Sequence, residues 1–492
     1  MEFDALEVDI GTPTPTVLVN GEDAQELGVH PLDRVQIDRD GRTTVAIVEV
    51  TDGLVPPGTL GVTKPLGHLE GPVDVTIAPR PGSVRYVRKK LDDVELEERE
   101  IRTIVRDINE NRLNDVELAA YVTGIYCHGL SLAETKHLTQ CMTDVGETIE
   151  WGETPIADKH SIGGVAGNRV TPIVVPIVAA AGVKIPKTSS RAVTSPAGTA
   201  DTMAVFCGVE FSLEEVRDIV RQTNGCMVWG GGVNLSPVDD KIIRAETPLS
   251  LDPPGQIIAS VLSKKKSAGS THVLVDLPYG EGTKVAGLPE ARELAEDFER
   301  VGEHLGMHVE CVVSEGEAPI GRGIGPVLEA RDVLAVLSGD GPDDLRRKGV
   351  RLAAITLDLC GVEADARGIL ESGDALAKFR EIVAAQDGDP DVEVDDLRPG
   401  AHREVVRAER EGEVTRVDNR LVSDVARRAG APKDAAAGIV LEVGVGDAVE
   451  VGDPLFTVHA EQRAKLDDAM ALVGRTEAVR VRDPEDARIE RV

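Results

Sequence analysis

The sequence predicts a multidomain α/β protein with an N-terminal small β-barrel, a helical domain, an α/β domain with a largely parallel sheet, and a C-terminal hammerhead-like β domain. The chain has 492 residues, enough for roughly three domains that each bury a hydrophobic core. The apolar spacing changes from a strand period to a helical period near residue 84, and short strands return after about residue 400. Between these points apolar runs alternate with helical patterns, which is typical of a layered α/β domain.

Residues 1–84 are expected to form the β-barrel. The predicted strands are 16–19, 34–37, 44–50 and 73–77. Asn20, Asp40 and Asp52 each precede a glycine and indicate turns. This module contains no catalytic constellation, so we expect it to serve structure or assembly.

Residues 85–160 are expected to form the helical domain, and part of 185–240 is a candidate addition to it. One predicted apolar helix face consists of Val116, Ala119, Ala120, Val122 and Ile125. Ser131 and Glu134 have the spacing of a capping box, which indicates the start of the next helix.

Residues 161–390 are expected to form the α/β domain, and 400–492 the C-terminal β domain. Predicted parallel strands of the first are 227–229, 271–275 and 308–313, and predicted strands of the second are 411–417, 438–443 and 452–458. Ligands of such α/β sheets gather at the carboxyl ends of the strands, here after Trp229 and Val275. The C-terminal domain lacks the Met-Lys hairpin tip of a biotinyl carrier, which argues against carrier chemistry.

The chain is strongly acidic, with 54 Lys and Arg against 86 Asp and Glu and a formal charge of −32. Such a surface repels nucleic acid and anionic membranes, so we expect neither as a partner. Dense surface carboxylates and few aromatic residues also suit a salt-rich cytosol, and we expect a halophilic origin.

The six cysteines are scattered, without the spacing of a disulfide framework or a zinc site. We therefore expect neither disulfides nor a zinc site. We also expect no other metal and no cofactor. The N-terminus lacks the pattern of a signal peptide, and no apolar run reaches the roughly 18 residues of a membrane span. These features predict a soluble cytoplasmic protein.

Two clusters of Gly, Ser, Thr, Lys and Arg flank the apolar segment 172–183. They are residues 159–169 (KHSIGGVAGNR) and 187–199 (KTSSRAVTSPAGT). Small residues leave backbone N–H groups accessible to an oxyanion, while Lys159, Arg169, Lys187 and Arg191 supply positive charge. The pair predicts an anion cradle, although two surface loops around a buried helix would have a similar composition.

These clusters, followed by residues 259–264 (ASVLSK), resemble the thymidine/pyrimidine-nucleoside phosphorylase family over about residues 90–470. The form of 187–201 and the extra N-terminal module resemble the archaeal AMP phosphorylase branch of that family. The resemblance implies cleavage of AMP, with CMP and UMP as further candidate substrates, by phosphate as co-substrate. The products would be the free base and ribose 1,5-bisphosphate, which feeds RubisCO through an isomerase. It also implies a homo-oligomer, at least a dimer through the helical region, with residues 1–84 as a contact for larger assemblies.

The resemblance also implies roles for individual residues. The phosphate-binding residues would be Lys159, His160, Ser161, Thr171, Ser189 and Thr199. The AMP-binding residues would be Gly164, Ser190, Arg191, Ala192, Val193, Thr194, Ser195, Thr199, Ser260 and Lys284. Lys264 is a candidate on the base side, and Asp252 would protonate the leaving base. His160 could instead be structural, and Asp252 could simply open a turn, because Pro-Pro-Gly follows it.

Two positions depart from the family pattern. Ala245 stands where the pyrimidine enzymes carry a base-reading Arg, and Pro278 stands where they carry a Lys that we expect in the turn after a strand. A pyrimidine-nucleoside phosphorylase therefore remains an alternative. A non-catalytic nucleotide sensor is an alternative from another class.

Two further stretches have weaker signals. Residues 230–232 are three glycines after a strand, but the spacing of a dinucleotide fingerprint is absent, so we expect a flexible loop. Asp239, Asp240 and Lys241 could bind a cation, and a solvated turn is the simpler expectation.

Overall fold

The structure, a computed structural model, describes residues 1–12, 14–192, 195–233, 235–249 and 251–482. The chain divides into two compact units. The first comprises residues 1–145 and 237–256, and the second comprises 146–236 and 257–492. In the described ranges no helix is long and apolar enough to cross a membrane.

The first unit contains the predicted barrel, which is closed in the strand order β1-β5-β2-β4-β3-β6. Its elements are β1 (Glu2–Glu7), β2 (Thr16–Asn20), α1 (Gly21–Leu27), β3 (Arg34–Arg39), β4 (Arg42–Thr51), β5 (Thr59–Val62) and β6 (Gly71–Ile77). Inward-facing apolar side chains such as Val17, Val48 and Val75 fill the interior. The expected turn at Asn20 is wrong, because the Asn20 side chain instead accepts from Glu22 N and caps α1.

The helical region follows as α2 (Val84–Leu91), α3 (Glu98–Asn109), α4 (Asp115–His128) and α5 (Leu132–Asp144), and α9 (Pro237–Glu246) joins the same unit. The capping box of Ser131 and Glu134 is confirmed at the start of α5. The predicted face of α4 is partly wrong: Val122 and Ile125 are buried, but Val116 is 67% exposed and Ala119 is exposed as well. Leu118 and Tyr121 are buried in their place. The helix turns this face inward because its neighbours α2 and α9 pack there.

The second unit contains the predicted parallel strands. β7 (Ala157–Ser161) pairs with β10 (His272–Tyr279), which pairs with β11 (His308–Glu315), and β8 (Ile185–Ser189) pairs with β9 (Gly225–Trp229). All of these pairs are parallel. A bridge from Ile156 to Lys184 connects the two groups of strands.

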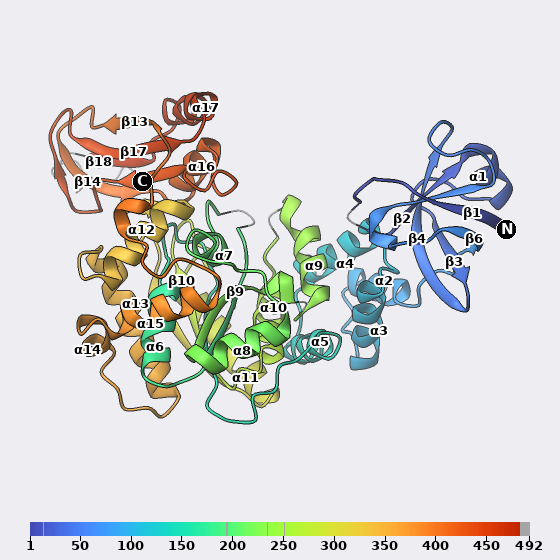
Figure 1. The fold of residues 1–492 in the computed structure, drawn as a ribbon, viewed down its shortest axis with the longest axis horizontal. Helices are drawn as coiled ribbons and strands as arrows, with labels where there is room; N and C mark the ends of the chain where they lie inside the picture. Colours follow the sequence, from blue (N-terminus) through green and yellow to red (C-terminus); the bar gives the residue numbers. More distant parts are fainter. Residues whose placement is uncertain (13, 193–194, 234, 250, 483–492) are drawn as a thin grey trace. The chain divides into compact units, whose positions relative to one another are not determined.

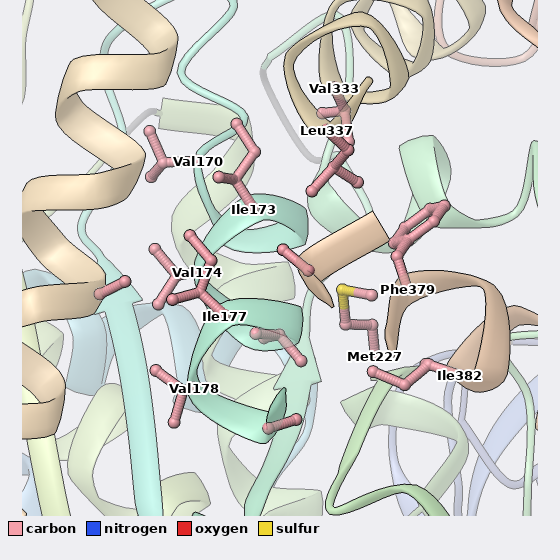
Figure 2. Close-up of a cluster of buried hydrophobic side chains, with 14 of the residues drawn as sticks. Val170, Ile173, Val174, Ile177, Val178, Met227, Val333, Leu337, Phe379 and Ile382 are labelled. Atoms are coloured by element: carbon pink, nitrogen blue, oxygen red, sulfur yellow. The ribbon is translucent and has the colours of Figure 1, made fainter. Parts of the chain in front are cut away.

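The apolar segment between the two polar clusters is α6 (Thr171–Ala180), a helix buried on nearly all sides. Ile173, Val174 and Ile177 pack in a core that also includes Met227 of β9 and Phe379 (Figure 2). The other helices of this layer are α7 (Thr199–Met203), α8 (Leu213–Thr223), α10 (Pro254–Ser267), α11 (Leu288–His304), α12 (Pro326–Leu337), α13 (Asp343–Leu359), α14 (Ala366–Glu371) and α15 (Asp374–Ala385). This core fixes α6, the helix that joins the two polar clusters in the sequence.

The C-terminal β domain has two small antiparallel sheets, with the orders β12-β15-β17-β13 and β16-β14-β18. Figure 1 shows four of these strands, β13, β14, β17 and β18, together with α16 and α17. Its elements are β12 (Gly323–Ile324), β13 (His402–Arg407), β14 (Gly412–Val417), α16 (Asn419–Ala429), β15 (Gly438–Leu441), β16 (Ala448–Val449), β17 (Pro454–Ala460), α17 (Arg463–Val473) and β18 (Val479–Arg482). The four-part architecture predicted above is confirmed. Domain boundaries near residues 84, 160 and 400 remain our proposal.

Candidate functional site

The site is organised by the carboxyl ends of neighbouring parallel strands. β7 ends at Ser161 and β8 ends at Ser189. Ser161 is opposite Asp276 in the register of β7 and β10, and Ser189 is opposite Trp229 in the register of β8 and β9. The two polar clusters of the sequence therefore both begin at strand ends, where parallel sheets bind their ligands.

Lys159 is an almost fully buried ammonium group on β7. Burial lowers its pKa to about 8, Asp276 opposes this shift, and the cations of Lys348, Arg169 and Lys265 lower the pKa further. A lysine whose positive charge is this poorly compensated gains from a bound anion.

His160 follows Lys159 in a similarly cationic environment. Burial lowers the pKa of its imidazole well below the ordinary value, and the surrounding lysines, Lys265 foremost, lower it further. His160 is therefore neutral at physiological pH and can donate one hydrogen bond, not two.

Asp276 is a carboxylate in the middle of β10, opposite the end of β7, and no sequence pattern indicated its role. It accepts a hydrogen bond from Ser161 Oγ at 3.1 Å and one from Ser314 Oγ at 2.7 Å. Lys348 Nζ of α13 forms an ion pair with it at 2.9 Å. Burial opposes ionisation, but Lys348 and Lys159 outweigh it, and the pKa of Asp276 lies below its ordinary value. Ser161 is therefore engaged with Asp276 in this structure.

A second buried ionic group lies under β8. Asp158 pairs with Lys265 at 3.0 Å and with Lys187 at 3.9 Å, and Lys265 also donates to Thr188 O at 3.1 Å. Burial, together with the charge of Lys265, lowers the pKa of Lys187 well below its ordinary value. Lys187, which we expected to face an anion, is thus held inside the protein. The lysines around these strand ends (Lys159, Lys187, Lys265 and Lys348) outnumber the carboxylates between them (Asp158 and Asp276).

Ser189 Oγ at the end of β8 is a buried hydroxyl with no hydrogen-bond partner within the described ranges. Buried hydroxyls are normally paired, so the Ser189 hydroxyl is a candidate to bind a ligand. The signal could not be read from the sequence, because it depends on what surrounds the side chain.

The loop after β8 is organised by Asp201 of α7. Its carboxylate accepts from Ala192 N at 2.6 Å and from Gly198 N at 2.9 Å. A Cβ at Gly198 would lie 2.6 Å from Ser190 O, so the loop closes on itself only with glycine there. Ser195 Oγ donates to Ala197 O at 2.9 Å. Val193 and Thr194, which we also expected to contact AMP, lie outside the described residues.

The side chain of Arg191 extends from this loop toward two carboxylates. Its guanidinium is 3.3 Å from Asp201 and 2.8 Å from Glu210, and it lies over the Trp229 ring at 5.2 Å from the centroid. Glu210 is well exposed, so that pair is weak and exchangeable.

Arg169 connects the first cluster to the second. Its Nε is 2.6 Å from the buried carboxylate of Glu329, and its other nitrogens donate to Thr199 Oγ1 at 3.1 Å and to Ala197 O at 2.9 Å. Arg169 therefore positions Thr199, the first residue of α7. Thr171 is likewise the first residue of α6, whose N-terminal N–H groups add positive potential.

Gly164 packs against the backbone of the loop that carries Lys284. Its φ is +92°, and an added Cβ would lie 2.8 Å from Thr283 Cα and 3.0 Å from Lys284 N. Asn419, the first residue of α16, fixes the same region by accepting from Ala166 N at 3.0 Å and donating to Gly316 O at 2.8 Å. Two residues expected to bind AMP are thus brought together. Asn419 was not found from the sequence.

The remaining predicted residues lie around α10, inside which the boundary between the two units falls. Asp252 is an exposed residue shortly before the helix, and Ser260 and Lys264 are one turn apart on it. Pro278 lies within β10, so its expected place in the turn after the strand is wrong.

Around α9, Arg244 pairs with Asp115 of α4 at 3.5 Å, so it points away from the position of Ala245. Asp239 and Lys241 belong to α9, which corrects the expected solvated turn. Asp239 is buried, and Lys241 Nζ donates to the carbonyls of Ile108 and Asn109. In the described part of the chain no cluster of His, Cys, Asp or Glu could hold a metal ion.

Models of three protein families match successive parts of the chain. A glycosyl transferase helical bundle domain matches residues 84–146, and a glycosyl transferase a/b domain matches 153–349. A pyrimidine nucleoside phosphorylase C-terminal domain matches 413–478.

Similar proteins are known from several organisms. An AMP phosphorylase of Natronomonas pharaonis is 58% identical over 499 residues, covering 100% of both chains. AMP phosphorylases of Thermococcus kodakarensis and Methanosarcina mazei are 46% and 45% identical, covering 95% and 94% of this chain and 95% and 93% of their own. A crystal structure of an anthranilate phosphoribosyltransferase from Thermus thermophilus has a TM-score of 0.53 at 19% identity, over 61% of this chain and 98% of that one. The last likeness concerns the fold alone.

Proposed function

The chain belongs to the AMP phosphorylase family, and from this premise we propose that it is a glycosyltransferase that cleaves AMP with inorganic phosphate. The N-glycosidic bond breaks, a phosphate oxygen forms the new bond to C1′ of the ribose, and the departing adenine takes up a proton. The products are adenine and ribose 1,5-bisphosphate. No redox step is involved.

The observation that carries this proposal is the excess of buried lysine side chains over carboxylates around these strands, next to the Ser189 hydroxyl, which has no partner among the described residues. Buried lysines whose pKa values are lowered are stabilised in the charged form by an anionic ligand, even in a chain of net charge −32. We assign the attacking phosphate to Lys159, His160, Ser161, Thr171, Ser189 and Thr199. Holding phosphate and ribose in line can lower the barrier by about 7–11 kcal/mol.

The substrate's 5′-phosphate needs a second anion site. We assign it to Arg191, Ser195 and Lys284, with Thr194 as a further member, because Arg191 can offer a bidentate contact and its side chain is 39% exposed. Gly164, Ser190, Ala192, Val193 and Thr199 complete the AMP-binding set.

We assign the contacts with the leaving base to α10 and to the residues just before it. Asp252 is the proposed proton donor, and Ser260 and Lys264 are proposed to contact the base. General acid catalysis of this type contributes roughly 10²- to 10⁴-fold. Ala245 lacks the guanidinium that would read a pyrimidine, which favours AMP, while CMP and UMP are further candidate substrates.

The activity fits nucleotide degradation in which ribose 1,5-bisphosphate passes through an isomerase to RubisCO. We propose a homo-oligomer, at least a dimer, with residues 1–84 as an assembly module. Arg34 of the barrel makes a bidentate contact with Glu117 of α4, so the barrel is held on the helical region. Light scattering of the full chain and of a chain without residues 1–84 tests this proposal. Equal numbers of subunits in the two assemblies would show that the barrel has no role in assembly.

A substrate panel tests the proposed function. AMP, CMP, UMP, adenosine and uridine are each incubated with phosphate, and base release is followed by chromatography. Preference for AMP over adenosine supports the proposal, whereas preference for uridine identifies a pyrimidine-nucleoside phosphorylase. AMP binding without release of any base identifies a nucleotide sensor.

A further inference from the structure

Lys348 occupies a position that no family motif drew attention to. It lies on α13, far from both polar clusters in the sequence, and its side chain is 15% exposed. Its Nζ is 2.9 Å from Asp276 Oδ2 and 3.2 Å from Ser314 Oγ. Lys348 of α13 thus contacts the middle of β10 and the neighbouring strand β11.

Asp276 is the group on which Lys348 acts. It is fully buried, and it also accepts hydrogen bonds from the hydroxyls of Ser161 and Ser314. A buried carboxylate attracts any nearby ammonium group strongly. Lys159 is such a group, because Asp276 is the charge that most favours its ammonium form. Among the described residues, however, Lys348 is the lysine that forms the ion pair with Asp276.

We propose that Lys348 is a positioning residue, which neutralises Asp276 and so leaves the ammonium group of Lys159 available to the attacking phosphate. This inference rests on the proposed function, because it takes Lys159 to hold that phosphate. Without Lys348, Asp276 would draw Lys159 to itself, and phosphate would have to compete with a fixed internal anion for that ammonium group.

The first measurement is the KM for phosphate in Lys348→Met. We expect it to rise by roughly tenfold or more, the size of one lost charge-assisted hydrogen bond, with a smaller change in kcat at saturating phosphate. Lys348→Arg keeps the charge and should stay near the wild type. Lys378→Met is the matched control, because Lys378 is 17% exposed and also pairs with one carboxylate, that of Glu381. If Lys348→Met proves unfolded by circular dichroism, Lys348→Gln takes its place.

The double variant Asp276→Asn with Lys348→Met separates positioning from direct binding. Once the competing carboxylate is removed, the KM for phosphate should recover to within a few-fold of the Asp276→Asn single variant. If it stays as high as in Lys348→Met, Lys348 acts as a direct ligand or as a structural support, and the inference is overturned.

The pH above which phosphate affinity falls gives an independent readout, because this fall reports the deprotonation of Lys159. Lys159 is surrounded by Asp276 of β10, Lys348 of α13, Arg169 before α6, Lys265 of α10, Lys187 of β8 and its neighbour His160. With a Lys159 pKa of about 8, phosphate affinity should fall above about pH 8. Removing the positive charge of Lys348 should raise the pKa of Lys159, so the loss of phosphate affinity should begin at a higher pH. Asp276→Asn removes a negative charge and should lower the pKa of Lys159, so that loss should begin at a lower pH. Shifts in the same direction, or no shift, would overturn the inference.

Calorimetric binding of inorganic phosphate alone keeps this test separate from that of the proposed function. If the wild type releases no adenine from AMP with phosphate, the proposed function fails. The Kd values for phosphate of the same variants still decide the role of Lys348.

Discussion

The guanidinium of Arg191 lies 2.8 Å from the carboxylate of Glu210, a residue outside the loop that carries Arg191. An arginine that is to bind a substrate phosphate must be released from such a partner. Because Glu210 is well exposed, the pair contributes only about 0–1 kcal/mol, and exchange for a phosphate is favourable.

Replacing Arg191 should therefore damage the use of AMP more than the use of adenosine. For Arg191→Met we expect kcat/KM for AMP to fall about 10- to 100-fold, with a much smaller loss on adenosine. Arg221→Met on α8, which removes an exposed Arg paired with Asp218, is the control. Equal losses on both substrates would show that Arg191 serves the loop and not the 5′-phosphate.

Glu210→Gln should act in the opposite direction. Removal of the competing carboxylate frees Arg191, so the KM for AMP should fall by up to about fivefold. Steady-state kinetics at fixed saturating phosphate measures this. An increase in KM would indicate that Glu210 orients Arg191 and does not compete for it.

Asp252→Asn should lower kcat at least about 100-fold with little change in KM, because an amide cannot transfer a proton to the leaving base. Initial rates of adenine release from AMP provide both constants. A kcat near that of the wild type would remove Asp252 from the mechanism and leave it as the residue that precedes α10.

Gly164→Ala should disturb the contact between the glycine loop and the loop of Lys284. Gly163→Ala is the matched control, because Gly163 also has a positive φ, +89°, but open space where its Cβ would lie. We expect Gly163→Ala to cost only the strain of the left-handed backbone, roughly 1–2 kcal/mol of unfolding free energy. Gly164→Ala should in addition raise the KM for AMP. Identical AMP kinetics in the two variants would contradict a role for the close approach.

Salt should stabilise the folded chain. With a formal charge of −32, like charges repel across the surface, and raising KCl from about 0.1 M to about 1 M shortens the screening length from about 10 Å to about 3 Å. We expect the Tm to rise by at least about 5 °C, more than in sucrose of equal osmolarity. An unchanged or lower Tm in KCl would refute the halophilic interpretation.

The sequence was sufficient for features that depend on local chemistry. Composition alone identified the two polar clusters that flank α6, and the spacing of Ser131 and Glu134 identified the start of α5. Features that depend on tertiary packing could not be predicted from the sequence. Val116 fitted a helical apolar pattern but faces outward, because the neighbours of α4 decide which face is buried.

The charge network of the site could not be predicted from the sequence either, because it also depends on packing. Lys348 and Asp276 meet only because the register of β10 and the packing of α13 bring them together. Asn419 likewise reaches the glycine loop from the C-terminal domain. Such pairs join residues distant in the sequence, and no single-sequence pattern marks them.

The phosphate dependence of adenine release tests the central claim most directly. AMP is incubated with the full chain with and without inorganic phosphate, and adenine and the sugar product are quantified together. The account predicts adenine and ribose 1,5-bisphosphate in equal amounts, and only when phosphate is present. Release of adenine with ribose 5-phosphate in the absence of phosphate would contradict it.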